Sequence, residues 1–295
     1  MLTGIHFLTT YACNFQCDHC FLHCSPSARG TFTIGQVRSV LEQLRALGTI
    51  DSVCFEGGEP FLYLPLVLEG LELAGRMGFK VSVLSNAYWA TSIDDAALAL
   101  RLLKQRGLAA ISVSDDALHY GEAPGEHARR VEQAAAQLGM SAKVLCTAHP
   151  EAVQVEPPRA PTIKGGVMFR GRAADKLAGG LPLCRWDSFT KCSHEKLDDP
   201  RRVHVDCFGH VHLCQGLTMG NLWQAPMREL VRNYRPADHP IVGPLLVGGP
   251  AELARRHGVP HEDGYVDECH LCYRVREKLL QRFPQYLAPL LVYGR

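Results

Sequence analysis

The chain has 295 residues, with 31 Lys and Arg against 30 Asp and Glu and a formal net charge of +1. This length allows one large domain or two modest ones, and the balanced charge gives no sign of binding to nucleic acid or to a membrane surface. The chain contains no apolar run of the roughly 20 residues that span a bilayer and does not begin with a signal-peptide pattern, so we expect a cytoplasmic protein.

The first 170 residues alternate β-rich runs with helical patterns, which is typical of βα units around a parallel sheet. Strands are expected at 4–10, 52–55, 80–84, 109–114, 142–147 and 163–169. Helices, with apolar residues at spacings of three and four, are expected at 34–47, 64–77, 94–106 and 126–138. Prolines in 149–162 predict a loop in place of the next crossover helix. The pattern predicts an α/β fold, a partial (β/α)6 TIM-like barrel.

The pattern changes near residue 175, which predicts a core domain at 1–175 and a smaller domain at 176–295. In the second part, VHVDC and VHLC flank Phe208, Gly209 and His210, and this arrangement predicts a β-hairpin. The Pro- and Gly-rich segment 239–250 is expected to precede a helix near 252–256. The run CHLCYRVREKLLQRF predicts a helix opened by two cysteines.

The 12 cysteines point to metal ligation or catalysis, because a reducing compartment disfavours a disulfide framework. Three of them, Cys13, Cys17 and Cys20, follow the first strand in the run CNFQCDHC. Three thiolates on an iron-sulfur cubane leave one iron free to bind a small molecule. Structural zinc is the alternative, but it usually takes four ligands from paired CxxC knuckles, and only one such pair is present here.

The second strand ends in FEGGEP, which contains Gly57, Gly58 and Glu59. Two glycines allow the backbone to approach a ligand closely, and a carboxylate beside them can hold an ammonium group. Ligands of parallel αβ arrays bind beyond the carboxyl ends of the strands. A tight βα turn is the simpler explanation of this run taken alone, and the cysteine loop one unit earlier favours a ligand site.

Together these motifs resemble the radical S-adenosylmethionine (SAM) superfamily, over about residues 4–170. The resemblance implies that Cys13, Cys17 and Cys20 ligate a [4Fe-4S] cluster whose open iron binds the amine and carboxylate of SAM. Further residues would bind the cofactor or the substrate: Gly57, Gly58 and Glu59 at the amine, His19 at the adenine, and Ser85, Asn86 and Ser114 at the next strand ends. Three residues are acid/base or substrate-contact candidates: Asp115, Asp116 and His119.

Six further cysteines lie beyond the core, at positions 184, 192, 207, 214, 269 and 272. With the hairpin and the distal CxxC, they resemble the SPASM and twitch auxiliary-cluster domains. The resemblance implies one auxiliary [4Fe-4S] cluster on Cys192, Cys214, Cys269 and Cys272, with Cys184 or Cys207 as alternatives to Cys192. The twitch arrangement is favoured because the central CxxCxxxxxCxxxC run of a full SPASM domain is missing. A four-thiolate zinc site is the alternative.

The remaining cysteines have simpler interpretations. Cys54 and Cys146 lie in apolar strands, which predicts buried small hydrophobic residues, with Cys146 also a candidate hydrogen-atom donor. Cys24 follows the cluster loop as a spare thiol or a neighbour of the cluster.

The resemblance implies cleavage of SAM to a 5'-deoxyadenosyl radical and abstraction of a substrate hydrogen atom. The leading hypothesis is a redox-coupled modification of a peptide or protein. A small-molecule oxidoreductase resembling the aminocyclitol dehydrogenases is the alternative, and a non-catalytic metal scaffold is a third interpretation. An external one-electron donor such as flavodoxin or ferredoxin is expected, without membrane or nucleic-acid partners.

Overall fold

The structure, a computed structural model, describes residues 1–121, 124–153 and 162–295. Its main sheet has eight strands in the order β11-β10-β9-β1-β2-β3-β4-β5. The six neighbours from β9 to β5 are parallel, and β10 and β11 continue the sheet antiparallel beside β9. Two further pairs, β6 with β7 and β8 with β12, form small separate sheets. The parallel sheet with its covering helices and C-terminal extension confirms the predicted partial-barrel fold.

The strands have the following bounds: β1 Gly4–Leu8, β2 Ser52–Glu56, β3 Lys80–Ser85, β4 Ala110–Ser114, β5 Ser141–Leu145, β6 Glu151–Val153, β7 Thr162–Lys164, β8 Cys184–Arg185, β9 Arg202–Asp206, β10 His210–Cys214, β11 Leu217–Asn221 and β12 Gly264–Tyr265. The helices have the following bounds: α1 Ile34–Leu47, α2 Leu64–Arg76, α3 Ile93–Gln105, α4 Ala117–Tyr120, α5 Glu126–Gln137, α6 Arg172–Lys176, α7 Met227–Asn233, α8 Val242–His257 and α9 Glu268–Leu279. Short 3-10 turns occupy Pro60–Tyr63, Trp186–Ser188 and Leu290–Tyr293.

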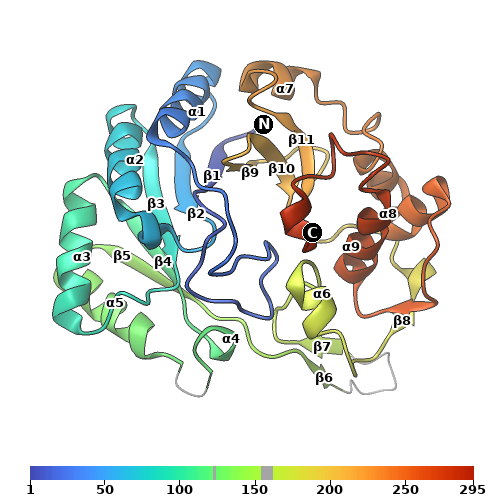
Figure 1. The fold of residues 1–295 in the computed structure, drawn as a ribbon, viewed down its shortest axis with the longest axis horizontal. Coiled ribbons are helices and arrows are strands. Elements are labelled where there is room, and N and C mark those ends of the chain that lie inside the picture. Colours follow the sequence, from blue (N-terminus) through green and yellow to red (C-terminus); the bar gives the residue numbers. More distant parts are fainter. Residues whose placement is uncertain (122–123, 154–161) are drawn as a thin grey trace.

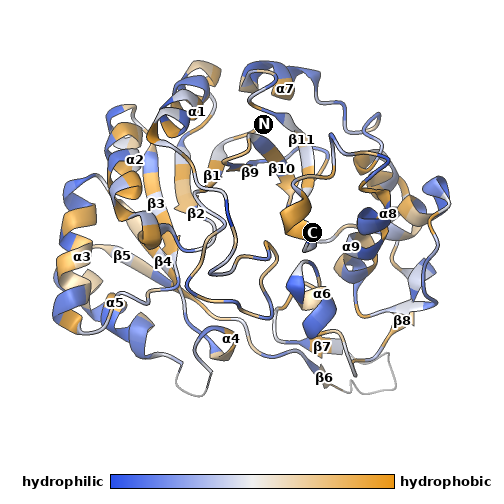
Figure 2. Ribbon diagram, in the orientation of Figure 1, coloured by the Kyte–Doolittle hydropathy of each residue, from blue (hydrophilic) through white to orange (hydrophobic). Residues whose placement is uncertain are grey.

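Helix α1 has the bounds predicted from its capping and apolar pattern. Helix α1 begins after Thr33, whose side chain and that of Gln36 form a capping box, and it ends at Gly48 with φ +76°. Its apolar side chains, spaced by three and four residues, are buried against the sheet. Helices α1, α2 and α3 lie on the outer side of the curved sheet (Figure 1). Figure 2 shows apolar residues on the strands and polar residues on the helices' outward faces.

The sixth strand of the parallel sheet differs from the prediction. Residues 163–169 do not form it; only Thr162–Lys164 is a strand, and it pairs antiparallel with β6. The sixth parallel position is taken by β9, which lies beside β1. The predicted proline-rich loop falls largely at 154–161, outside the described residues. Strand β9 comes from beyond residue 175, so the segment assigned to the smaller domain continues the core sheet.

Helix α8 also differs from the prediction, because it begins inside the Pro- and Gly-rich segment, at Val242. The backbone is non-helical at Gly248 and Gly249, and Pro250 then opens the second half of the helix, where its missing N–H costs nothing. A Cβ on Gly249 would lie 2.3 Å from the backbone nitrogen of Lys191. Glycine therefore lets the kinked helix pack against that segment. The predicted hairpin at Gly209 (β9–β10) and the cysteine-opened helix α9 are both confirmed. No helix among the described residues is long and apolar enough to cross a membrane.

Candidate functional site

The cysteine loop runs between β1 and α1 and is closed on itself by two isolated bridges, which pair Thr10 with Thr31 and Ala12 with Ser25. Cys13, Cys17 and Cys20 all line one cavity at the carboxyl ends of the parallel strands. All three are free thiols. The structure therefore brings together the three ligands that the sequence predicted for the first cluster.

The Gly-Gly-Glu turn after β2 lies directly on this loop. The Gly58 amide donates to the Thr10 carbonyl at 2.6 Å, and the Glu59 amide donates to the Ala12 carbonyl at 2.9 Å. A Cβ on Gly58 would lie 2.0 Å from the Ala12 carbonyl oxygen, and one on Gly57 would lie 2.6 Å from that of Thr10. Both glycines are thus required by the close approach of two backbones. They also line the cavity.

Glu59 is fully buried and does not line the cavity. Its Oε1 accepts from the Phe61 amide and the Ser85 hydroxyl, each at 2.9 Å, and its Oε2 accepts from the Asn86 amide at 2.8 Å. Burial raises the pKa of this carboxyl to about 7, although the three hydrogen bonds lower it. The carboxylate therefore joins the ends of β2 and β3, behind the surface where the sequence placed an amine contact.

The other predicted cofactor contacts, His19, Ser85, Asn86 and Ser114, line the same cavity. Asn86 connects the β3 end to the cysteine loop, because its Nδ2 donates to Asn14 Oδ1 at 2.8 Å. His119, at the end of β4 in the short helix α4, also lines the cavity.

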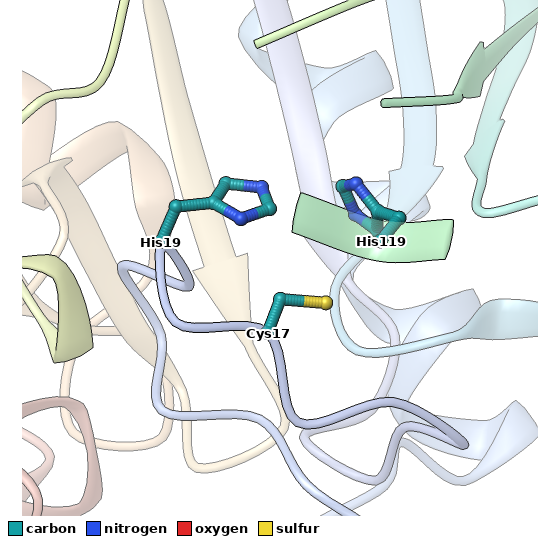
Figure 3. A group of neighbouring side chains, drawn as sticks. All are labelled: Cys17, His19 and His119. Atoms are coloured by element: carbon teal, nitrogen blue, oxygen red, sulfur yellow. The ribbon is translucent and has the colours of Figure 1, made fainter. Parts of the chain in front are cut away.

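The rings of His19 and His119 face each other beside Cys17, as Figure 3 shows. The two ring centroids are 4.7 Å apart, and potential ligand atoms of all three residues lie within 4.8 Å of one another. Burial, followed by the charge of His119, lowers the pKa of His19 to about 4. A neutral imidazole therefore faces the cavity.

The thiols of the loop differ in their surroundings. Burial raises the pKa of Cys13 to about 11 and that of Cys17 to about 12. The pKa of Cys20 is lowered to about 6, mainly because the Cys24 thiol donates a hydrogen bond to it. Cys24 is buried and lines the cavity as a fourth thiol. A metal would hold the buried thiols as thiolates and release their protons, so this donor set fits a bound iron-sulfur cluster.

Asp115 and Asp116 serve as caps and do not line the cavity. The Asp115 carboxylate accepts from the Gly125 amide at 2.6 Å and the Ala128 amide at 2.8 Å, at the start of α5. Asp116 caps α4 and accepts from the His119 ring at 2.9 Å. Both carboxylates accept hydrogen bonds from backbone amides and lie outside the cavity lining. This arrangement does not favour an acid/base role for either of them in the cavity. Of the three candidates, only His119 faces the cavity.

A second cavity gathers the four distal cysteines, Cys192, Cys214, Cys269 and Cys272. They come from a loop, the end of β10 and the first turn of α9. Burial raises the pKa of Cys272 to about 12 and that of Cys269 further still, so both thiols would be neutral without a metal. The two alternatives to Cys192 lie elsewhere: Cys184 is in β8, and Cys207 is buried against Gly30. The geometry therefore favours Cys192.

Two buried arginines face these thiols. Arg170 is 4% exposed and donates to Cys214 Sγ at 2.8 Å, and Arg276 is 1% exposed. The Nε atom of each has no hydrogen-bond partner among the described residues. Glu195 Oε1 lies 3.5 Å from Arg170 and offsets part of this positive charge. The rest calls for negative charge, and four thiolates around either a [4Fe-4S]2+ core or a zinc ion carry about two net negative charges. The cavity therefore fits a four-thiolate metal centre of either kind.

A family model for the radical SAM superfamily matches residues 7–132. This range covers the cysteine loop, the Gly-Gly-Glu turn and the strands that carry the other cavity residues. Over these residues the chain matches the radical SAM superfamily of enzymes, which agrees with the predicted resemblance at that level.

The chain is also similar to curated proteins over part of its length. It is 32% identical over 86 residues to an S-adenosylmethionine-dependent nucleotide dehydratase of Selenomonas ruminantium, covering 29% of this chain and 30% of that protein. It is 25% identical over 107 residues to the putative peptide biosynthesis protein YydG of Bacillus subtilis (strain 168), covering 36% of this chain and 34% of that protein. The match therefore spans about a third of the length of these relatives.

Among solved structures, the chain resembles BtrN in complex with AdoMet and 2-DOIA. The TM-score is 0.53 at 16% identity, and the match covers 79% of this chain and 83% of BtrN. At this identity the likeness concerns the fold, and it extends well past the region matched by the family model.

One residue that contacts the cysteine loop was not predicted from the sequence. Arg172 opens α6 and is 7% exposed; its guanidinium donates to the carbonyls of Cys17 and Cys24, and its amide donates to the Cys20 carbonyl at 2.9 Å. A Cβ on Gly171 would lie 2.4 Å from Phe21 Cα, so this turn lies directly against the cysteine loop. The run GRAA was visible in the sequence, but nothing local indicated its partner some 150 residues earlier.

The isolated cysteines divide as follows. Cys54 is buried on β2, as predicted. Cys146 is exposed, because β5 ends at Leu145 before reaching it. The prediction of a buried Cys146 is therefore wrong.

Proposed function

We propose that this chain binds a [4Fe-4S] cluster on Cys13, Cys17 and Cys20 together with SAM in the same cavity, and uses them to modify a substrate after hydrogen-atom abstraction. The carrying observation is that one cavity combines three cysteine thiols with the backbone of the Gly-Gly-Glu turn and with polar groups from the ends of β3 and β4. Bound there, the cluster would supply the electron that splits SAM into methionine and a 5'-deoxyadenosyl radical, which removes a hydrogen atom from the substrate.

The residues of the chain position these groups and exclude water. Gly57 and Gly58 leave room for a ligand to approach the backbone at the end of β2. His19 offers a neutral ring to an adenine, and Asn86 and Ser114 offer hydrogen bonds to the rest of the cofactor or to the substrate. Such positioning converts a reaction between separate molecules into one within a single complex.

We further propose an auxiliary [4Fe-4S] cluster on Cys192, Cys214, Cys269 and Cys272. This group would accept an electron from the substrate after hydrogen abstraction. Arg170 and Arg276 support the proposal because these buried cations would compensate the charge of a four-thiolate centre. Zinc would satisfy the same charge, and counting iron and sulfide distinguishes the two.

The proposed substrate is a peptide or protein, and the modification is redox-coupled. The printed name of YydG, a putative peptide biosynthesis protein, supports this class. A small-molecule substrate is the second candidate, favoured by the similarity in fold to BtrN over 79% of this chain. In either case the first electron comes from an external donor such as flavodoxin or ferredoxin.

The test is anaerobic reconstitution followed by addition of SAM and dithionite. The wild-type chain should release 5'-deoxyadenosine, and Cys17→Ala should not. Cys192→Ala should still cleave SAM while losing distal iron. Absence of cleavage in a wild-type chain with both sites filled by iron would contradict the proposal and leave the metal-scaffold interpretation. A distal site that holds zinc without sulfide would contradict the auxiliary cluster alone.

A further inference from the structure

A separate group of metal-binding side chains lies on the inner face of the sheet: His6 of β1, Glu56 of β2 and His204 of β9. Glu56 Oε1 is 3.1 Å from His6 Nδ1 and 3.0 Å from His204 Nε2. The strand register places His6 directly opposite His204, with Glu56 two positions further along β2. Three adjacent hydrogen-bonded strands therefore hold the group, which is a rigid arrangement for a site.

Alternation along the strands shows which way these side chains point. Phe7 and Phe55 stack at 5.0 Å, and Phe55 contacts Gly70 of α2, so these rings occupy the helix-covered face. Their neighbours His6 and Glu56 therefore lie on the opposite, inner face. Glu56 also lines the cavity that contains the first three cysteines. It is the one carboxylate residue in that lining among the described residues.

The group is largely buried, and its His6 side chain is partly accessible to solvent. The side chains of Glu56 and His204 are 10% and 8% exposed, and that of His6 is 24% exposed. His6 Nδ1 is buried and has only the Glu56 carboxylate, at 3.1 Å, as a polar neighbour paired with it in the described chain. One carboxylate oxygen and two imidazole nitrogens thus converge within 4.8 Å of one another, and each of these atoms can serve as a metal ligand.

A second His and Asp group in the same sheet shows what a completed network looks like. Asp206 Oδ2 accepts from Tyr11, His210 and His212 at 2.9 to 3.2 Å, and Oδ1 accepts from two backbone amides. His212 Nδ1 accepts from the Gly216 amide at 3.1 Å. That group has its hydrogen bonds in place and offers little to a metal. The contrast identifies the group of His6, Glu56 and His204 as the incomplete one.

We propose that His6, Glu56 and His204 bind one divalent transition-metal ion at the inner edge of the cavity. Two imidazoles and one carboxylate suit zinc or ferrous iron. Glu56 Oε1 lies 3.1 Å from His6 Nδ1 and 3.0 Å from His204 Nε2, which is compatible with metal-ligand bonds of about 2.0–2.2 Å. Three protein ligands leave at least one coordination position open, which a water or a substrate oxygen would fill. The site is independent of SAM cleavage.

The experiment uses the reconstituted full-length holoenzyme, so that iron occupies the cysteines before zinc is added. After removal of unbound metal, the wild-type chain should retain one zinc per chain beyond any present before addition. X-ray absorption at the zinc edge should show nitrogen and oxygen neighbours without sulfur. Glu56→Gln and His204→Ala should weaken zinc binding by at least roughly 10- to 100-fold. The matched control His210→Ala, from the completed group, should bind zinc like the wild type.

Two results would overturn the proposal: zinc with sulfur neighbours, or equal zinc binding by the wild type and His204→Ala. Iron content and thermal unfolding report whether each variant is folded. If His204→Ala fails to fold, the more exposed His6→Gln replaces it with the same expected loss. SAM cleavage is measured in parallel, and loss of cleavage with normal zinc binding would count against the proposed function alone.

Discussion

Replacing Gly58 by alanine tests whether the Gly-Gly-Glu turn and the cysteine loop form one packed unit. The new Cβ would lie 2.0 Å from the Ala12 carbonyl oxygen and 2.6 Å from its carbon. Both atoms are backbone, so no side-chain rotation relieves the overlap, and the turn must separate from the loop. That movement breaks two hydrogen bonds, from Gly58 to Thr10 and from Glu59 to Ala12.

The cost of Gly58→Ala can be estimated from these contacts. Overpacking costs about 1–3 kcal/mol, and two lost hydrogen bonds cost about 0.5–1.5 kcal/mol each. The expected loss of unfolding free energy is about 2–6 kcal/mol, a large share of the about 5–15 kcal/mol of a typical protein. Gly75→Ala is the control, because Gly75 lies on the exposed side of α2 with nothing within 4 Å of its Cβ position. It should be stabilising by about 0.5–1 kcal/mol.

The assay is urea unfolding of the cluster-free chains, followed by circular dichroism, together with the iron content after reconstitution. Gly58→Ala should unfold at lower urea than the wild type and take up less iron at the first site. An unfolding midpoint equal to that of the wild type, with full iron uptake, would refute the argument that the two backbones are in required contact.

Three further predictions concern buried charged groups. Arg172→Ala removes two hydrogen bonds to the cysteine loop and should speed iron loss to a chelator, whereas Arg185→Ala, whose side chain is 80% exposed, should not. Arg276→Met should lower iron uptake at the distal cysteines without changing SAM cleavage, and Arg276→Lys, which keeps the positive charge, should take up more iron than Arg276→Met. Iron uptake equal to that of the wild type in both variants would contradict charge compensation. Burial raises the pKa of Glu59 to about 7, so its carboxyl contributes its full stability to the folded state below about pH 4.5. As the pH rises to about 7, the free energy of unfolding should fall by roughly 3 kcal/mol. Glu59→Gln should remove this slope from urea midpoints measured at pH 5 and pH 7.

Site residues that belong to short sequence motifs line the cavity as predicted, whereas some isolated polar residues at strand ends do not. The run CNFQCDHC and the Gly-Gly-Glu turn are short motifs whose residues act together, and the structure brings both to one cavity. Asp115 and Asp116 also followed a strand end, but the helices that start beside them take their carboxylates as caps. A polar residue at a strand end can therefore either line the site or cap the helix that follows, and the position of that helix determines which occurs.

Helices α1, α2, α3, α5 and α9, strands β1 to β5 and the grouping of the three N-terminal cysteines were predictable from the sequence, because periodicity, caps and motif spacing act over a few residues. The short helices α4, α6 and α7 and the start of α8 were not. Tertiary structure alone decided that β9 replaces the expected sixth strand and that His204 meets His6 across the β1–β9 pair. It also decided that Arg172 holds the cysteine loop and that Cys192, not Cys184 or Cys207, joins the distal cavity. The entropy of closing a long loop changes only slowly with its length. Spacing along the chain therefore carries little information about distant partners, which are chosen by the surfaces that pack together.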